Sequence, residues 1–248
     1  MTAVAIDVLT AEEMITIARE QVDSFNTGDW ERLQTRFTAD SRYHELGTQR
    51  KVESPEQIVE LERAIADHER RLVIPTGSTE IVPNVETAGG LVAAQAILRA
   101  AKRVTACLVG AEDMAADLGA ERTPEGIELV YVRSRFLVEC VAAGVVAIDA
   151  PYTFSDLEGV RADTLYARRL GYHAKSVVSP AHVAAVNDVL TPSLESVERA
   201  QRLVAAFEAA RAAGRDRVEH EGSLVEVPTY LTAKRLIARA EALARWIH

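Results

Sequence analysis

The sequence predicts an α/β protein built from parallel βα units. From residue 79 onward, short apolar runs rich in β-branched residues alternate with segments of helical period. Such continuously apolar strands are typical of parallel sheets that are covered on both faces. Apolar residues make up 48% of the 248-residue chain, which is enough for a sizeable core. We count four units, which correspond to half of a (β/α)8, TIM-barrel-type fold.

A mainly helical segment over residues 1–70 precedes these units. Thr10, followed three residues later by Glu13, is the signature of a capping box and predicts a helix that begins there. A further helix is expected from Pro55, because proline is favoured at the first helical position and Ser54 can cap it. The segment holds 8 basic and 15 acidic residues, a net charge of −7, against −2 for the remainder. This asymmetry indicates that the segment is a separate piece.

The βα units occupy residues 71–217 in the predicted division. Their strand-like runs are TEIVPNVE, RVTACLVGAED, GVVAIDAPY and YHAKSVVSP. The helix-like segments between them are TAGGLVAAQAILRAAK, GIELVYVRSRFLVECVAAG and SDLEGVRADTLYARRLG. A long amphipathic helix then leads to residues 218–248, where the hairpin-like stretch RDRVEHEGSLVEVP runs into a final helix.

The composition restricts the classes of partner. The net charge of −9 argues against nucleic acid, since phosphate contacts need clustered Lys and Arg. No apolar run approaches the roughly 18 residues of a membrane span, and no basic, apolar leader opens the chain. Cys107 and Cys140 both lie in apolar context, which predicts two buried thiols in a reducing compartment. We therefore expect a cytoplasmic protein without a membrane partner.

Two carboxylates end successive apolar runs. Glu86 closes the first run, and Asp113 closes the second 27 residues later, the length of one βα repeat. Functional groups of a (β/α)8 barrel gather at the C-terminal ends of its strands, so the two side chains should converge at one rim. Mg²⁺ usually takes one or two protein carboxylates, and the lack of a neighbouring His or Cys disfavours zinc. The alternative is that Glu86 favours the following helix N-terminus and Asp113 caps the next turn.

Several motifs, in the right order, resemble one known family. VPNVETAGGLVAA, LVGAEDMAADLGA, LVYVRSRFLVECVAAGVVAIDAPYTFSDLEG and LGYHAKSVVSPAHVAAVN are similar to the second half of the citrate lyase beta-subunit-like group of the HpcH/HpaI aldolase superfamily. The resemblance runs from about residue 71 to the C-terminus. It implies a (β/α)8 barrel and Mg²⁺-dependent carbon–carbon lyase or Claisen-type chemistry on acyl thioesters. It also implies metal binding by Glu86 of the ET motif and Asp113 of the G-x-x-D motif.

The same resemblance implies roles for further residues. The family's C-terminal lid carries a carboxylate that serves a neighbouring subunit as an acid/base, and the matching stretch GSLVEVP has Glu226 in place of aspartate. Asp149 ends a strand and matches the family's D-x-P pattern, so we expect it to shape the substrate site. Asp156 matches the DLEG pattern and is expected to be a helix N-cap. Ser179 stands where the family commonly has a histidine, which alters any contact made there.

The family's first half has no counterpart before residue 79. Its strand ending in PG, its D-x-E-D motif and its arginine for the substrate carboxylate are not found, and Arg36 and Arg42 lie in a different local pattern. A half barrel leaves open strand edges and an uncovered core. We therefore expect self-association into a homo-oligomer, which would also bring Glu226 toward a neighbour's metal.

Residues 10–70 weakly resemble the start of a SnoaL-like domain instead. The resemblance rests on the stretch FNTGDWERLQTRFTADSRYHELGTQRKVESPEQIVE. Asp40, Tyr43 and His44 would line a pocket in an intact member of that group. The alternative interpretation, which we favour, is that they are ordinary packing and surface residues.

The leading functional hypothesis is a Mg²⁺-dependent lyase. It would cleave a 3-hydroxyacyl thioester such as malyl-CoA or citramalyl-CoA, on CoA or an acyl carrier, to acetyl-CoA and a 2-oxo acid. Glu86 and Asp113 would bind the metal and Glu226 would be the acid/base. One rival is a non-catalytic, truncated family member that acts as an oligomeric binding protein. Another is a small-molecule binding or cyclase role centred on His44.

Overall fold

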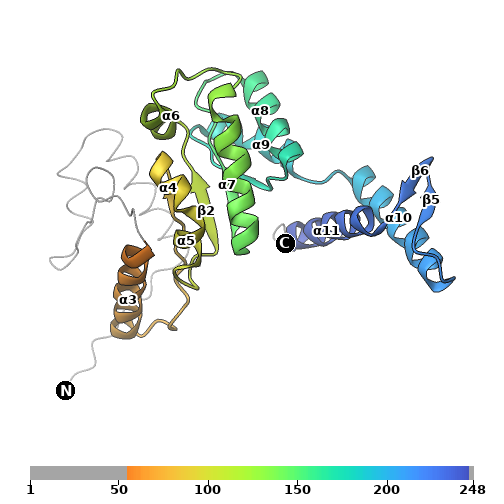
Figure 1. Cartoon of the computed structure of the whole chain (residues 1–248), viewed down its shortest axis with the longest axis horizontal. Helices are drawn as coiled ribbons and strands as arrows, with labels where there is room; N and C mark the ends of the chain where they lie inside the picture. Colours follow the sequence, from red (N-terminus) through yellow and green to blue (C-terminus); the bar gives the residue numbers. More distant parts are fainter. Residues whose placement is uncertain (1–54, 246–248) are drawn as a thin grey trace. The chain divides into compact units, whose positions relative to one another are not determined.

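The computed structural model describes residues 55–245, and the chain divides into two compact units at Lys51 and Val52. The second unit is described here (Figure 1). Its first part contains α3 (Pro55–Leu72), β1 (Asn84–Val85), α4 (Ala88–Val92), α5 (Ala94–Arg99), β2 (Ala106–Val109), α6 (Glu112–Leu118), η1 (Ile127–Leu129), α7 (Val130–Ala143) and β3 (Val146–Asp149). Its second part contains α8 (Leu157–Leu170), β4 (Ala174–Lys175), η2 (Pro180–His182), α9 (Val183–Leu190), α10 (Leu194–Ala212), β5 (Val218–His220), β6 (Ser223–Val225) and α11 (Val227–Ala244).

Strands β1 to β4 form one parallel sheet in sequence order. The register pairs Asn84 with Leu108, Cys107 with Ala147, and Asp149 with Lys175. Each connection between neighbouring strands contains at least one helix, as parallel pairing requires. The four predicted βα units are therefore confirmed as a mixed α/β fold with a four-stranded parallel sheet.

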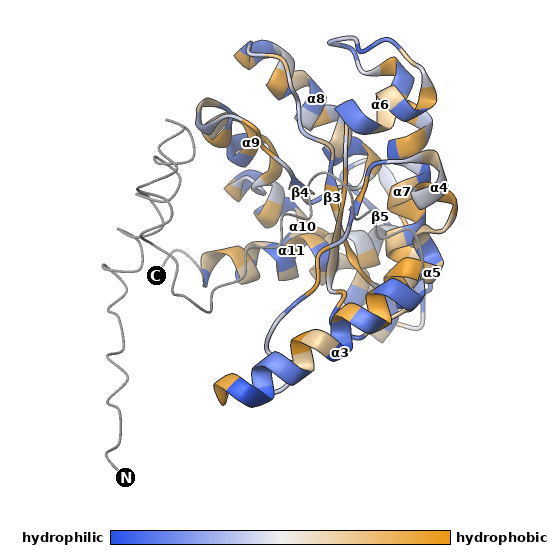
Figure 2. Ribbon diagram, turned by 90° about the vertical axis from the view of Figure 1, so that its left-hand side faces the viewer, coloured by the Kyte–Doolittle hydropathy of each residue, from blue (hydrophilic) through white to orange (hydrophobic). Residues whose placement is uncertain are grey.

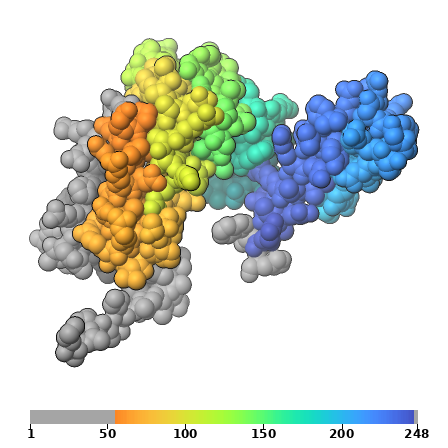
Figure 3. Space-filling view, turned by 60° about the horizontal axis from the view of Figure 1, so that its bottom comes forward, coloured from red at the N-terminus to blue at the C-terminus, as the bar shows by residue number. Residues whose placement is uncertain are grey.

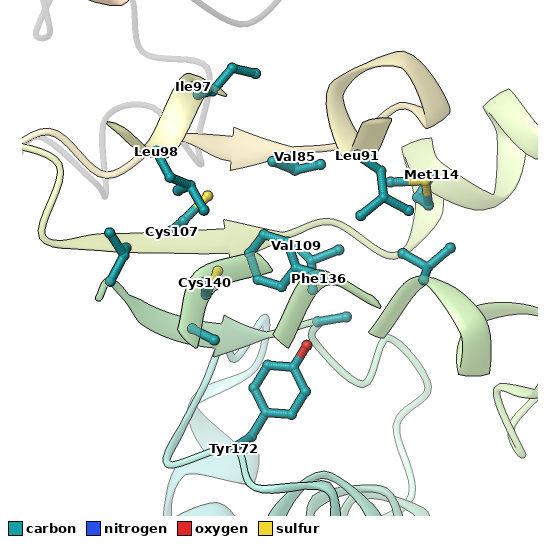
Figure 4. Close-up of a cluster of buried hydrophobic side chains, with 14 of the residues drawn as sticks. Val85, Leu91, Ile97, Leu98, Cys107, Val109, Met114, Phe136, Cys140 and Tyr172 are labelled. Atoms are coloured by element: carbon teal, nitrogen blue, oxygen red, sulfur yellow. The ribbon is translucent and has the colours of Figure 1, made fainter. Parts of the chain in front are cut away.

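The core lies between the sheet and the helices packed on one of its faces. Cys107 and Val109 of β2 have no exposed surface, whereas Val146 of β3, which points to the other face, is 54% exposed. The core includes Val85, Leu91, Ile97, Leu98, Cys107, Val109, Met114, Phe136, Cys140 and Tyr172 (Figure 4). The two cysteines are free and buried, as predicted. The neighbouring Cys140 thiol and burial raise the pKa of Cys107, so its thiol stays protonated.

Helix α3 packs on this same unit. It begins at Pro55, as predicted, and carries interleaved hydrophilic and hydrophobic residues (Figure 2). It lies against α5, and the space-filling view shows the two segments in contact (Figure 3). Its buried Ile58 joins the core. Helix α3 is therefore part of the second unit.

A buried ion pair fixes the C-terminal end of α3. Glu69 is 1% exposed and accepts hydrogen bonds from two nitrogens of Arg103, at 2.8 and 2.7 Å. It also accepts from the backbone N–H groups of Gly77 and Thr79, at 2.8 and 2.9 Å. The Arg103 guanidinium, together with these N–H donors, holds the pKa of Glu69 far below its usual range. The end of α3 and the loop that follows it are thereby tied to Arg103, three residues before β2.

The C-terminal part forms a helical hairpin with a small sheet. Helices α10 and α11 pack on each other. The strands β5 and β6, which lie between these helices in the sequence, pair in an antiparallel manner and confirm the predicted hairpin. The Phe207 and Tyr230 rings stack with centroids 4.7 Å apart. Arg239 of α11 donates to the backbone carbonyl of His173 at 3.0 Å. Across residues 55–245, no helix is long and apolar enough to cross a bilayer.

Some local predictions differ from the structure. The helix expected over residues 87–102 divides at Ala93 into α4 and α5, and the short helices α6 and α9 were not predicted. The predicted helices over residues 10–37, with the Thr10 capping box, lie outside the described residues, as do Asp40, Tyr43 and His44.

The Glu69 pair predicts an acid-dependent loss of stability. Because the folded-state pKa of Glu69 lies below its unfolded value of 4.5, its contribution is complete above pH 4.5 and is lost as the pH falls further. The unfolding free energy of the wild type should therefore fall more steeply than that of Glu69→Gln from about pH 5 to about pH 3. Urea titrations at several pH values measure this. Glu60→Gln, an exposed change on the same helix, should keep the wild-type slope; equal slopes for all three proteins would contradict the prediction.

Candidate functional site

The C-terminal ends of the four strands lie at one edge of the sheet, because all four are parallel. Glu86 directly follows β1, and Asp113 lies in the first turn of α6, which follows β2. Asp149 is the last residue of β3, and Lys175 is the last residue of β4. Four chemically active side chains therefore arise at neighbouring positions along this edge, which we call the rim.

The glycine after β2 makes room for Glu86. A Cβ atom at Gly110 would lie 2.6 Å from Glu86 Cγ and 3.1 Å from Oε1. The Glu86 side chain thus extends from the end of β1 over the end of β2, where Gly110 N–H donates to Val85 O at 2.9 Å. Asn84 also donates to the Glu86 carboxylate. These contacts direct the half-buried carboxylate toward the start of α6.

Helix α6 presents Asp113 beside the loop that follows β1. Asp117 Oδ2 accepts from Ala88 N–H at 2.8 Å, two residues beyond Glu86. Asp113 lies four positions before Asp117 and therefore on the same side of the helix. Asp113 is exposed, and within residues 55–245 no hydrogen bond or ion pair engages its carboxylate. The Asp117 contact was not predicted, because the helix α6 that carries Asp117 was not predicted.

The capping alternative does not hold for Asp113. Thr87 is the N-cap of α4, and its side chain accepts from Gly90 N–H at 3.0 Å. Ala111 is the N-cap of α6 and has no side-chain cap hydrogen bond. Asp113 therefore does not occupy the cap position that the alternative required. For Glu86, the alternative was a favourable interaction with the dipole of the following helix, here the five-residue α4, and it stays a prediction.

Asp149 is the centre of a buried charge cluster. It has no exposed surface and accepts from Arg133 Nε and Nη2 at 2.8 and 2.7 Å. Lys175 Nζ lies 2.7 Å from its second oxygen and also donates to Asp163. Arg133 Nη1 donates to Asp163 at 2.7 Å. Two cations and two carboxylates are thus paired crosswise where β3 and β4 end; we call them the tetrad.

The tetrad keeps its charges despite burial. Burial alone would raise the pKa of Asp163, but Lys175 and Arg133 together lower it below its ordinary value. Asp149 and Asp163 in turn raise the pKa of Arg133 against the effect of burial. Tyr172 OH donates to the Arg133 carbonyl at 2.7 Å, and burial raises the pKa of this phenol. Asp149 is therefore fully paired within the tetrad, and its role at the substrate site stays a prediction; sequence analysis did not find Arg133 or Asp163.

The remaining predicted residues lie at helix N-termini. Asp156 is the N-cap of α8 and accepts from Gly159 N–H at 2.6 Å, which confirms the prediction. Ser179 is the N-cap of η2 and accepts from Ala181 N–H at 3.3 Å. Glu226 is the N-cap residue of α11 but makes no cap hydrogen bond through its side chain. Its carboxylate is exposed.

Together, the parallel sheet and the acids at its C-terminal edge define an α/β protein with an oxygen-rich rim. Comparison with known proteins identifies the family of this α/β protein. Residues 48–180 match the family described as HpcH/HpaI aldolase/citrate lyase. Citrate lyase subunit beta from Leuconostoc mesenteroides subsp. cremoris is 34% identical over 193 residues, 77% of this chain and 64% of that protein. Mitochondrial citramalyl-CoA lyase from Mus musculus is 30% identical over 204 residues, 78% of this chain and 60% of that one.

A solved structure agrees with these relatives. CitE from Mycobacterium tuberculosis, in complex with magnesium, acetoacetate and coenzyme A, matches with a TM-score of 0.60 at 29% identity, over 77% of this chain and 66% of that chain. The chain belongs to the HpcH/HpaI aldolase/citrate lyase family, in its citrate lyase beta-like group. It spans 64% of the length of the Leuconostoc protein. The match begins at residue 48 rather than 71, and so it includes α3.

The tetrad predicts a large loss of stability when one charge is removed. Asp149→Asn leaves Arg133 and Lys175 with an uncompensated buried charge, so the unfolding free energy should fall by about 3–5 kcal/mol. Urea denaturation at neutral pH measures this. Asp188→Asn is the control, because Asp188 pairs with Arg161 and both side chains are more than half exposed. It should change the free energy by less than about 1 kcal/mol; equal small effects from both variants would contradict the account of the tetrad.

Proposed function

We propose that this chain is a Mg²⁺-dependent carbon–carbon lyase. It would cleave a 3-hydroxyacyl thioester of the malyl-CoA or citramalyl-CoA type to acetyl-CoA and a 2-oxo acid. Glu86 and Asp113 would hold the metal, and Glu226 would be the acid/base. The sheet would be half of a (β/α)8 barrel that a further copy or segment completes.

The observation that carries the proposal is the arrangement of Glu86 and Asp113. They follow adjacent parallel strands; Glu86 lies against Gly110 just before α6, and Asp117 of α6 accepts a hydrogen bond from the loop after β1. Among residues 55–245, no group of three or more His, Cys, Asp or Glu side chains gathers as a metal site. Two carboxylates with open positions for water and substrate oxygens suit Mg²⁺, which usually takes one or two protein carboxylates. The donor set therefore fits the proposed metal.

The relatives support the same chemistry. The Mycobacterium tuberculosis protein was solved with magnesium, acetoacetate and coenzyme A, a metal, an oxo acid and a thiol carrier together. The mouse relative is a citramalyl-CoA lyase. A bound Mg²⁺ would act as a Lewis acid toward the oxo-acid oxygens and stabilise the charge that develops there.

The lyase reaction also needs proton transfer at the hydroxyl of the substrate. When the carbon–carbon bond breaks, that hydroxyl loses its proton, and the thioester carbon that is released gains one. Glu226 is a carboxylate at the exposed start of α11, with no helix-cap contact to restrain it. We propose that it moves this proton in the site of a neighbouring subunit, which makes a homo-oligomer the active form.

The first prediction of this proposal concerns turnover. Wild-type protein should release acetyl-CoA from malyl-CoA or citramalyl-CoA only when Mg²⁺ is present. Glu86→Gln and Asp113→Asn should each lower kcat/KM by at least about 100-fold, because each loses one of two charged ligands. Asp117→Asn keeps an oxygen acceptor for Ala88 N–H and should retain most activity. No release by folded wild-type protein from either substrate would favour a non-catalytic binding role.

A second prediction concerns Gly110. Gly110→Ala places a Cβ 2.6 Å from Glu86 Cγ, so the flexible Glu86 side chain must turn away from the end of β2. Affinity for Mn²⁺, used as a spectroscopic substitute for Mg²⁺, should fall about tenfold, a typical effect of disturbing a ligand's support. Electron paramagnetic resonance of free Mn²⁺ measures this.

The matched control is Gly89→Ala. A Cβ at Gly89 meets nothing within 4 Å, so this variant should bind Mn²⁺ like the wild type. Thermal unfolding of both variants shows whether they are folded. Unchanged Mn²⁺ affinity in folded Gly110→Ala would mean that the Glu86 position over β2 has no part in metal binding.

A further inference from the structure

Arg122 joins the first turn of α6 to two other segments of the rim. It lies in the loop between α6 and η1, and its side chain is only 16% exposed. Its Nε donates to Glu112 Oε1 at 3.0 Å, and its Nη2 donates to Thr153 Oγ1 at 3.2 Å. Its Nη1 donates to the buried carboxylate of Glu128. One planar guanidinium thus connects α6, the short helix η1 and the loop after β3.

Further contacts hold the same group in place. Thr153 also donates to Glu112, so the threonine and the arginine both engage one carboxylate. The Arg122 guanidinium lies 5.7 Å from the centroid of the Phe154 ring, within the range of a cation–π contact. Glu128 in turn accepts from Thr123 Oγ1 at 3.0 Å. The guanidinium therefore has little freedom to move, and Glu112 is tied to a fixed partner.

Glu112 and Asp113 are adjacent in sequence but differ in their contacts. The Thr153 hydroxyl, together with Arg122, lowers the pKa of Glu112, which keeps it ionised and paired. The Asp113 carboxylate has no hydrogen bond or ion pair within the described residues. Of two acids in one helical turn, one anchors the turn and the other is available to a ligand.

We propose that Arg122 is a positioning residue for the metal site. Through Glu112 it fixes the first turn of α6 against the loop after β3, while Asp117 fixes the helix against the loop after β1. Asp113 is then held in one orientation toward Glu86. The proposal rests on the proposed function, because it assumes that these two carboxylates bind Mg²⁺.

The sign of the effect separates positioning from simple electrostatics. Arg122→Ala removes a positive charge near a cation site, and charge alone would then tighten cation binding. Positioning predicts the opposite result, a loss of Mn²⁺ affinity of about tenfold, as expected when support for a ligand is removed. Arg122→Lys keeps the charge but cannot form the same fork of hydrogen bonds, so it should also weaken binding, by about threefold or more.

The test measures Mn²⁺ affinity by electron paramagnetic resonance, with unfolding curves to show that each variant is folded. Glu112→Ala should weaken binding about as much as Arg122→Ala, and the double variant should be no weaker than either, because both act through one contact. Arg161→Ala, which breaks a surface pair with Asp188, should change nothing. If Arg122→Ala does not fold, Arg122→Lys carries the same test.

Two results would overturn the proposal. Unchanged or tighter Mn²⁺ binding by a folded Arg122 variant would show that Arg122 does not position the site. Fully additive losses in the double variant would show that Arg122 does not act through Glu112. A failure of the proposed function would give a different result. Glu86→Gln would then bind Mn²⁺ as tightly as the wild type, because Glu86 would not be a metal ligand.

Discussion

The buried tetrad is the interaction on which the sheet most depends. Taking four charges out of water is unfavourable, and only close pairing of opposite charges offsets the desolvation. Arg133 comes from α7, Asp163 from α8, and Asp149 and Lys175 from the ends of β3 and β4. Each side chain is needed by the others, so these four elements cannot separate without exposing an unpaired buried charge. The C-terminal ends of β3 and β4 are therefore the rigid half of the rim.

The acids described above divide into two kinds according to their partners. Glu69, Asp149 and Asp163 are paired with buried cations and serve the fold. Asp113 and Glu226 are exposed, and no hydrogen bond or ion pair holds their carboxylates within the described residues. A carboxylate that is already paired with an arginine binds a metal ion or a proton only weakly. The contacts therefore leave Asp113 and Glu226 open to a ligand or a proton, while Glu86, the other proposed metal ligand, accepts from the Asn84 amide.

The sequence predicts the sheet well because its signals are local. Apolar runs bounded by helical segments indicate parallel strands, and the DLEG stretch indicates an N-cap at Asp156, where the structure has one. The short helix α6 was missed because its first residues, in the stretch GAED, were assigned to the end of a strand. The tetrad was missed because its four members come from four elements, and a strand of two residues does not show which way Lys175 points. One signal was present: Arg133 stands among apolar residues in a helix, which is typical of a buried ion pair.

The candidate site is less predictable because it depends on contacts between loops. Glu86 and Asp113 could be selected from strand ends and spacing, but nothing local indicates that Gly110 leaves room for Glu86 or that Asp117 holds Ala88 N–H. These supports come from residues that lie next to the proposed ligands in the fold. The rim has two different sides. The buried tetrad holds the ends of β3 and β4, whereas a few contacts between loops hold the residues after β1 and β2. The tetrad fixes the ends of β3 and β4, and the loop contacts position the Glu86 and Asp113 side chains.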